Sequence, residues 1–177
     1  VVRIIRVITQ FEPVHLNVPN ENYVRIVRQM LRDGGVPLQR VVLHQIKTNE
    51  NWTRDHGPAF VQRTRRGRLD TAIVDWGFNA WGGKYPPWDA DDAVPTKVAG
   101  ELGLPVFNAD IVMEGGAVDV NGAGTLLTTT SCLLNRNRNP QCSKNEIEGL
   151  LKAYYGQRQV IWLGEGIAGD DTDGHVD

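Results

Sequence analysis

The sequence predicts an α+β fold built from a repeated strand–strand–helix–strand unit. Two segments carry this order of elements, at about residues 55–107 and 114–163. An opening segment, about residues 1–47, supplies strand, helix and strand, and a further unit begins at about 173–177. Units of about 50 residues repeated in this way indicate a propeller-like or toroidal array. The 19 glycines and 9 prolines favour many turns over a helical bundle.

In the opening segment, the apolar run Val1–Ile8 is interpreted as a strand. Asn20 is expected to cap a helix, because apolar residues then recur every three or four positions until Gly34. The run Val41–Ile46 is typical of a buried strand. This segment therefore resembles a repeat unit that lacks its first strand.

The first complete unit is predicted to begin with a hairpin of Ala59–Gln62 and Thr71–Trp76, which are joined by a basic turn. A helix should begin at about Asp92 and end at Gly103, a residue type that commonly follows the last helical turn. Pro105–Phe107 then supplies a short strand.

The second unit repeats this order. Ala117–Val120 and Thr125–Thr129 flank Asn121-Gly122, a strong hairpin signal. Gln159–Leu163 closes the unit as a strand. The helix between these elements carries a capping box at its start and a glycine at its end, at Ser143, Glu146 and Gly156.

Ionisable residues stand where each unit begins, a position that we call the unit entrance. Asp55 and Glu114 precede the two hairpins, and His175 and Asp177 lie where a further hairpin should begin. Asp55, Glu114 and His175 are 59 and 61 residues apart, one repeat each. In a ring of units, equivalent entrances converge on the axis, so the spacing predicts a negative pocket with one group that titrates near neutral pH.

Each of these residues also has a purely structural interpretation. Asp55 beside Arg54 is compatible with a surface ion pair, and Glu114 before two glycines with a β-bulge. His175 among aspartates is compatible with a solvated loop. The shared spacing favours the pocket over these three separate explanations.

Composition excludes some classes of protein. A formal net charge of −2 gives no basic footprint for nucleic acid, and no apolar run is long enough to span a bilayer. Two cysteines, Cys132 and Cys142, make no disulfide framework, so a reducing, cytoplasmic setting is expected. Because the chain begins inside a strand-like run and ends in a turn-rich loop, we interpret it as a piece of a longer protein.

Several strings resemble one family, the agmatine deiminases and bacterial, Porphyromonas-type peptidylarginine deiminases, which modify guanidine groups. The resemblance extends from about Lys47 to the last residue. The strings are NWTRDHGP (51–58), DWGFNAWGG (75–83), MEGG (113–116), LLTTT (126–130), LNRNRNP (134–140) and GHVD (174–177). The resemblance implies a pentein-type β/α propeller of five ββαβ units, of which the chain would hold about two and a half to three.

The resemblance also implies a reaction and roles for its residues. The intact protein would hydrolyse the C–N bond of a small guanidinium substrate, agmatine first, giving N-carbamoylputrescine and ammonia for putrescine and polyamine synthesis. Asp55 and Asp177 would bind the guanidinium, with Trp52 as a wall of the pocket. His175 would act as general acid and then base, supported by Glu114. Neither a cofactor nor a metal is implied, and a homo-oligomer is left open.

A nucleophile is missing from this set. The family mechanism forms a thiouronium intermediate on a cysteine, which the resemblance implies lies downstream of Asp177. Cys132 follows a threonine-rich strand and is interpreted as a buried structural thiol. We therefore expect residues 1–177 alone to have no turnover.

Two alternatives stay open. The segment between Gly83 and Trp88 is short compared with agmatine-specific relatives, which would leave the pocket mouth open to a peptide arginine. A protein arginine deiminase, producing citrulline, is therefore the first alternative. The second is a module that binds a metal or a guanidinium without turnover, because His175 and the acidic loop before it offer nitrogen and oxygen ligands.

Overall fold

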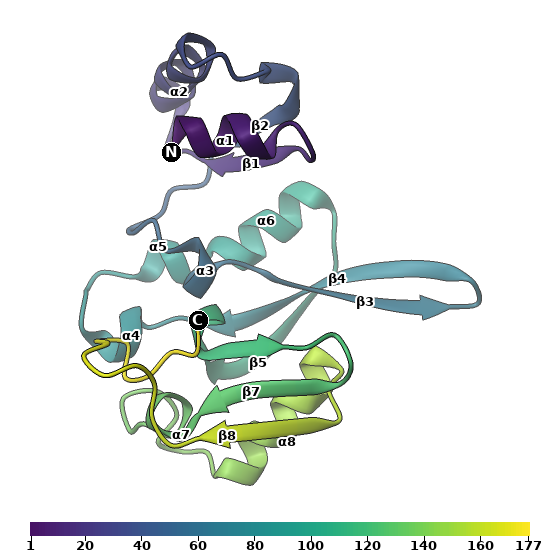
Figure 1. The fold of residues 1–177 in the computed structure, drawn as a ribbon, viewed down its shortest axis with the longest axis vertical. Coiled ribbons are helices and arrows are strands. Elements are labelled where there is room, and N and C mark those ends of the chain that lie inside the picture. Colours follow the sequence, from purple (N-terminus) through teal and green to yellow (C-terminus); the bar gives the residue numbers. More distant parts are fainter. The chain divides into compact units, whose positions relative to one another are not determined.

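A computed structural model describes residues 1–177, and the chain falls into two compact units, Val1–Thr48 and Asn49–Asp177 (Figure 1). Each unit has its own hydrophobic cluster. None of the helices is both long and apolar enough to cross a membrane. The expectation of one incomplete domain stays a prediction, as do its internal boundaries.

The first unit contains two parallel strands that are joined through a helix. Strand β1 pairs with β2 in parallel, and α2 lies between them in sequence. The elements are α1 (Val2–Ile8), β1 (Val14–Asn17), α2 (Glu21–Asp33), the 3-10 turn η1 (Leu38–Arg40) and β2 (Val41–His44). The predicted N-cap of α2 is confirmed, because the Asn20 side chain accepts hydrogen bonds from two backbone N–H groups.

The prediction of a strand at Val1–Ile8 is wrong, because these residues form helix α1. Their apolar residues come in pairs separated by single arginines, so one face of a helix collects Val2 and Ile5. Ile5 is buried against Leu31 and Val36 with Val2 beside it, whereas the outward Ile4 stays exposed. The strand–helix–strand order is present, but its first strand is β1.

The second unit begins with a short helix, a long hairpin, three further helical segments and a strand. These are α3 (Thr53–His56), β3 (Ala59–Arg65), β4 (Arg68–Gly77), α4 (Ala80–Gly83), α5 (Asp89–Asp92), α6 (Val94–Leu102) and β5 (Val106–Val112). The same unit continues with η2 (Gly115–Ala117), β6 (Val118–Val120), β7 (Thr125–Thr129), α7 (Thr130–Leu133), α8 (Lys144–Tyr155) and β8 (Gln159–Leu163).

Two three-stranded sheets in this unit share one topology. In the first, β3 and β4 pair antiparallel and β5 joins β4 in parallel. In the second, β6 and β7 pair antiparallel and β8 joins β7 in parallel. A helix leads into the third strand of each sheet, α6 in one and α8 in the other (Figure 1). The predicted strand–strand–helix–strand order is therefore present twice.

The signals that bounded the two crossover helices behave as expected. Ser143 and Glu146 form both hydrogen bonds of a capping box at the start of α8. Gly103 and Gly156 end α6 and α8 with φ of 64° in each case, a left-handed conformation that glycine adopts without steric cost.

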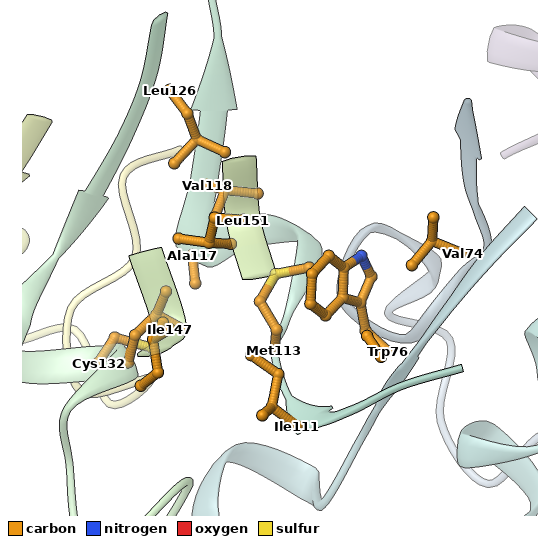
Figure 2. Close-up of a cluster of buried hydrophobic side chains, with 12 residues drawn as sticks. Val74, Trp76, Ile111, Met113, Ala117, Val118, Leu126, Cys132, Ile147 and Leu151 are labelled. Atoms are coloured by element: carbon orange, nitrogen blue, oxygen red, sulfur yellow. The ribbon is translucent and has the colours of Figure 1, made fainter. Parts of the chain in front are cut away.

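The main hydrophobic cluster joins the two sheets. Ile147 and Leu151, one turn apart on α8, are fully buried against Leu126 of β7, and each such side chain contributes about 1.5–3 kcal/mol. Figure 2 shows Met113, just after β5, beside the indole of Trp76 from β4. This packing holds the segment that leads into Glu114 against the first sheet.

Candidate active site

The predicted site residues come together in the structure. Asp55 lies on α3, Glu114 directly precedes η2, and α3 packs against η2. The backbone N–H of Val176 donates to the Gly116 carbonyl at 3.0 Å. That bond brings the C-terminal segment, with His175 and Asp177, to the same place.

A cavity of about 860 Å³ opens beside these residues. Asp55, His175 and Asp177 form part of its wall, whereas Glu114 lies behind it. Aromatic side chains supply further wall, from Trp52, Trp81 and Tyr85. Trp52, predicted as a wall, does line the cavity and keeps 57% of its surface exposed.

Asp55 is held by two donors. Its Oδ1 accepts from the Gly116 N–H at 3.1 Å, and its Oδ2 accepts from the Trp81 indole N–H at 3.2 Å. Burial raises the pKa of Asp55, and these two hydrogen bonds and the nearby His175 only partly oppose that effect. The carboxylate is thus oriented, but it lacks a permanently charged partner of its own.

Two local backbone features make this arrangement fit. Trp81 has a φ of 56°, in the left-handed region, which costs a non-glycine residue about 1–2 kcal/mol and directs its indole toward Asp55. Gly116 has no room for a side chain, since a Cβ would lie 2.7 Å from Asp55 Oδ1 and 2.8 Å from His175 Cε1. The double glycine after Glu114 therefore allows close approach rather than a bulge.

The His175 ring lies between two carboxylates. Its Nδ1 is 3.7 Å from Asp55 Oδ1 and 3.7 Å from Asp177 Oδ1. Its Nε2 is buried and has no hydrogen-bond partner within the chain. The His175 backbone N–H donates to Asp170 Oδ2 and to Thr172 Oγ1, at 3.1 Å each, so the loop before it sets the position of the ring.

Glu114 has a different environment. It is fully buried, and its Oε1 accepts from Arg138 Nε at 2.6 Å. The thiol of Cys132 lies 3.6 Å from its Oε2. Glu114, Cys132 and His175 each place one potential ligand atom within 4.8 Å of the others, which puts Glu114 close enough to His175 to act on it electrostatically.

Cys132 is an unsuitable nucleophile. The side chain is completely buried in α7. Burial, together with the adjacent Glu114, raises the pKa of its thiol, so the reactive thiolate is disfavoured at neutral pH. This matches the expected buried structural thiol.

Comparisons with known proteins identify the family of the chain. Residues 1–177 match the Porphyromonas-type peptidyl-arginine deiminase family. The chain belongs to this family. It is 44% identical over 177 residues to the agmatine deiminase of Ectopseudomonas mendocina, covering 97% of this chain and 46% of that protein. It is 47% identical over 143 residues to the agmatine deiminase of Medicago truncatula, covering 75% and 38%.

Solved structures give the same result. The agmatine deiminase of Enterococcus faecalis superposes with a TM-score of 0.82 at 36% identity, covering 99% of this chain and 47% of that one. A cysteine-to-serine variant of the C. jejuni agmatine deiminase, described as having substrate bound, gives 0.79 at 34%, covering 98% and 49%. The predicted partial pentein-type α+β propeller is confirmed, and the chain spans about half the length of the curated relatives it matches.

Sequence analysis gave no role to three residues that the structure places in or behind the site. Trp81 and Tyr85 line the cavity, and the Gly-Gly that follows Trp81 was the signal for the left-handed turn that directs its indole. Arg138 lies within the string 134–140, whose pattern gives it no role. Its contact with Glu114 spans 24 residues, and no local pattern indicates it.

Proposed function

We propose that the protein containing this chain deiminates agmatine hydrolytically, giving N-carbamoylputrescine and ammonia. The observation that carries the proposal is the shared cavity wall of Asp55, Asp177 and His175. Their side chains place two carboxylates within 3.7 Å of one imidazole nitrogen. This supports a site that binds a planar cation next to a group able to transfer protons.

The wall suits a guanidinium in particular. A guanidinium stays charged at neutral pH and offers N–H donors in one plane, which carboxylates bind in pairs. Asp55 and Asp177 supply the carboxylates, and Trp52 supplies an aromatic face that attracts a cation. Asp177 also faces Arg54, with Nε 3.4 Å from Oδ2, so Asp55 is the carboxylate that we assign to the substrate first.

The reaction needs a cysteine thiolate, and neither cysteine of this chain is placed to supply it. Cys132 is completely buried, and Cys142 packs against the main hydrophobic cluster and lines no part of the cavity. In the proposed mechanism, the thiolate of a cysteine elsewhere in the protein bonds to the guanidinium carbon. The bond from that carbon to one nitrogen breaks, and His175 gives the proton with which ammonia leaves. Water then adds to the same carbon while His175 takes its proton, and the carbon–sulfur bond breaks.

Agmatine is favoured over peptidyl-arginine by the rest of the wall. Agmatine carries a second positive charge on its amine, whereas the backbone of a peptide arginine has none at that place. Further carboxylates line the cavity, from Glu50, Asp170 and Asp171. An acidic wall beyond the guanidinium site favours a dication.

The test is an assay of the full protein on agmatine and on an arginine-containing peptide. We expect ammonia and N-carbamoylputrescine from agmatine, and loss of both products in His175→Gln. Citrulline in the peptide with agmatine left intact would replace the substrate while keeping the reaction. No product from either compound, with agmatine still bound in calorimetry, would indicate a binding module instead.

One observation favours a metal-binding module as a second candidate, namely the close approach of Glu114, Cys132 and His175. The Arg138 guanidinium already forms an ion pair with the Glu114 carboxylate, and a divalent cation would have to displace the guanidinium. Metal analysis of the purified protein separates the candidates. Stoichiometric metal that resists dialysis would support the module, and deimination that persists in chelator would support the enzyme.

A further inference from the structure

We propose that Arg138 is a positioning residue for the reaction, because it holds Glu114 and the loop that carries His175 in one fixed arrangement. The inference rests on the proposed deimination for its kinetic test but not for its structural test. Arg138 itself lines no part of the cavity that Asp55 and His175 share. It is therefore placed to act through its neighbours and not on the substrate.

Arg138 contacts Glu114 on one side. Arg138 is only 4% exposed, and its Nε donates to Glu114 Oε1 at 2.6 Å. Glu114 is fully buried, so bulk water does not screen its charge. Burial alone would lower the pKa of Arg138, but the charge of Glu114 and the hydrogen bonds to Asp173 and Glu114 together outweigh burial and raise that pKa. The Arg138 guanidinium therefore stays charged, 2.6 Å from the Glu114 carboxylate.

Arg138 also contacts the loop that carries His175. The Arg138 Nη2 group donates to the Thr172 carbonyl at 3.0 Å, and its Nη1 group donates to Asp173 Oδ2 at 2.8 Å. Thr172 in turn accepts the His175 backbone N–H through its Oγ1, at 3.1 Å. One guanidinium thus joins the acid behind His175 to the backbone that carries His175.

The turn that carries Arg138 is itself anchored. The Asn139 side chain accepts from the Val112 N–H and donates to the Val112 carbonyl, at 2.8 Å each, one residue before Met113. The carbonyl of Asn137 accepts from the Asn79 side chain at 2.9 Å. Since both flanking residues are fastened to other elements, the guanidinium has a fixed origin.

A guanidinium suits this place better than an ammonium does. Its three nitrogens lie in one plane and serve three separate partners, Glu114, Asp173 and Thr172. A lysine keeps the charge but has one nitrogen on a flexible stem, so it would serve fewer of these partners in fixed directions. Replacing Arg138 by lysine therefore separates the effect of the positive charge from the effect of the three directed hydrogen bonds.

The kinetic test compares Arg138→Met and Arg138→Lys with wild type in the full protein. We expect Arg138→Met to lower kcat on agmatine about 100-fold, the loss that a small misplacement of a reacting group causes. KM should stay within about threefold, because Asp55 and Trp52 are untouched, and Arg138→Lys should recover part of kcat. The matched control is Arg136→Met, two residues away and exposed, which should leave both constants unchanged.

Because Arg138→Met leaves Glu114 buried without its cation, a double variant guards against misfolding. Glu114→Gln with Arg138→Met removes both charges together. Because Arg138 would act through Glu114 as well as through the 172–175 loop, the loss of kcat in the double variant should be smaller than the product of the two single-variant losses. Independent, multiplying losses in kcat would overturn the proposal, and so would an unchanged kcat in Arg138→Met.

A crystal structure of the full-length Arg138→Lys variant gives a readout without activity. We expect the His175 ring to leave its place 3.7 Å from Asp55 and Asp177, or the 172–175 loop to separate from Glu114. An undisturbed site would overturn the positioning role even if the wild type deiminates agmatine. Conversely, a displaced loop in a protein that turns over no guanidinium compound would overturn only the proposed function.

Discussion

Within residues 49–177, the two repeats each begin with an acidic residue, but the two acids have different surroundings. Asp55 stands before the β3–β4 hairpin and faces the cavity, with two neutral donors on its carboxylate. Glu114 stands before the β6–β7 hairpin and is fully buried against Arg138. One acid is left to meet a cation from outside, and the other already has a cation from the chain.

This difference shows that equivalent positions of a repeat can hold acids with different surroundings. The order of elements brings both carboxylates close to His175. The surrounding side chains then decide what each carboxylate can do. Asp55 is available to a substrate, at a cost in stability. Glu114 is fully buried and lines no part of the cavity.

The largest expected effect concerns stability at Glu114. Glu114→Gln takes one of two carboxylate partners from the buried Arg138 guanidinium and leaves Asp173, and breaking a buried pair lowers the free energy of unfolding by up to about 3–5 kcal/mol. Denaturant titration of the full protein measures this loss. The control is Asp70→Asn, which removes an exposed ion pair with Arg63 and should cost at most about 1 kcal/mol. Equal losses in the two variants would end the contrast between the entrances.

Next is the effect of Asp55 on activity. Asp55→Asn removes the carboxylate that we assign to the substrate guanidinium, and kcat/KM should fall roughly 100- to 1,000-fold, as for a buried charge pair that loses one partner. Steady-state kinetics on agmatine measures it. A loss of less than tenfold would mean that Asp177 carries the binding, and the assignment of Asp55 would be wrong.

The same variant has an opposite and smaller effect on stability. Burial raises the pKa of Asp55, so between the unfolded and folded pKa values the folded protein binds more protons than the unfolded chain does. Stability therefore falls as the pH rises through that window, and the wild type is less stable than Asp55→Asn at neutral pH. Thermal melts of both proteins from pH 4 to pH 8 should show the difference growing with pH. A pH-independent difference would contradict the raised pKa.

The smallest effect lies away from both entrances. Ser143→Ala removes the side chain that caps α8, and the free energy of unfolding should fall by about 1 kcal/mol. The kcat/KM on agmatine should not change, because α8 lines no part of the cavity. A change in kcat/KM as large as that of Asp55→Asn would mean that the site tolerates no loosening of the second sheet.

Much of the architecture could be predicted because its signals are local. The hairpin at Asn121-Gly122, the capping box at Ser143 and the glycine stops of α6 and α8 each depend on a few neighbouring residues. The strand predicted at Val1–Ile8 failed for the same reason. Its apolar pairs suit either a strand or a helix, and only packing of Ile5 against Leu31 decides between them.

The sequence by itself indicated that Asp55, Glu114 and His175 would meet, since the spacing of 59 and 61 residues between them matches one repeat each. Only the tertiary structure decided which side chains contact Asp55 and Glu114. The deciding hydrogen bonds join Trp81 to Asp55 and Arg138 to Glu114, which are 26 and 24 residues apart in sequence. Contacts over such separations depend on how whole sheets pack, and no local pattern of residue types encodes them.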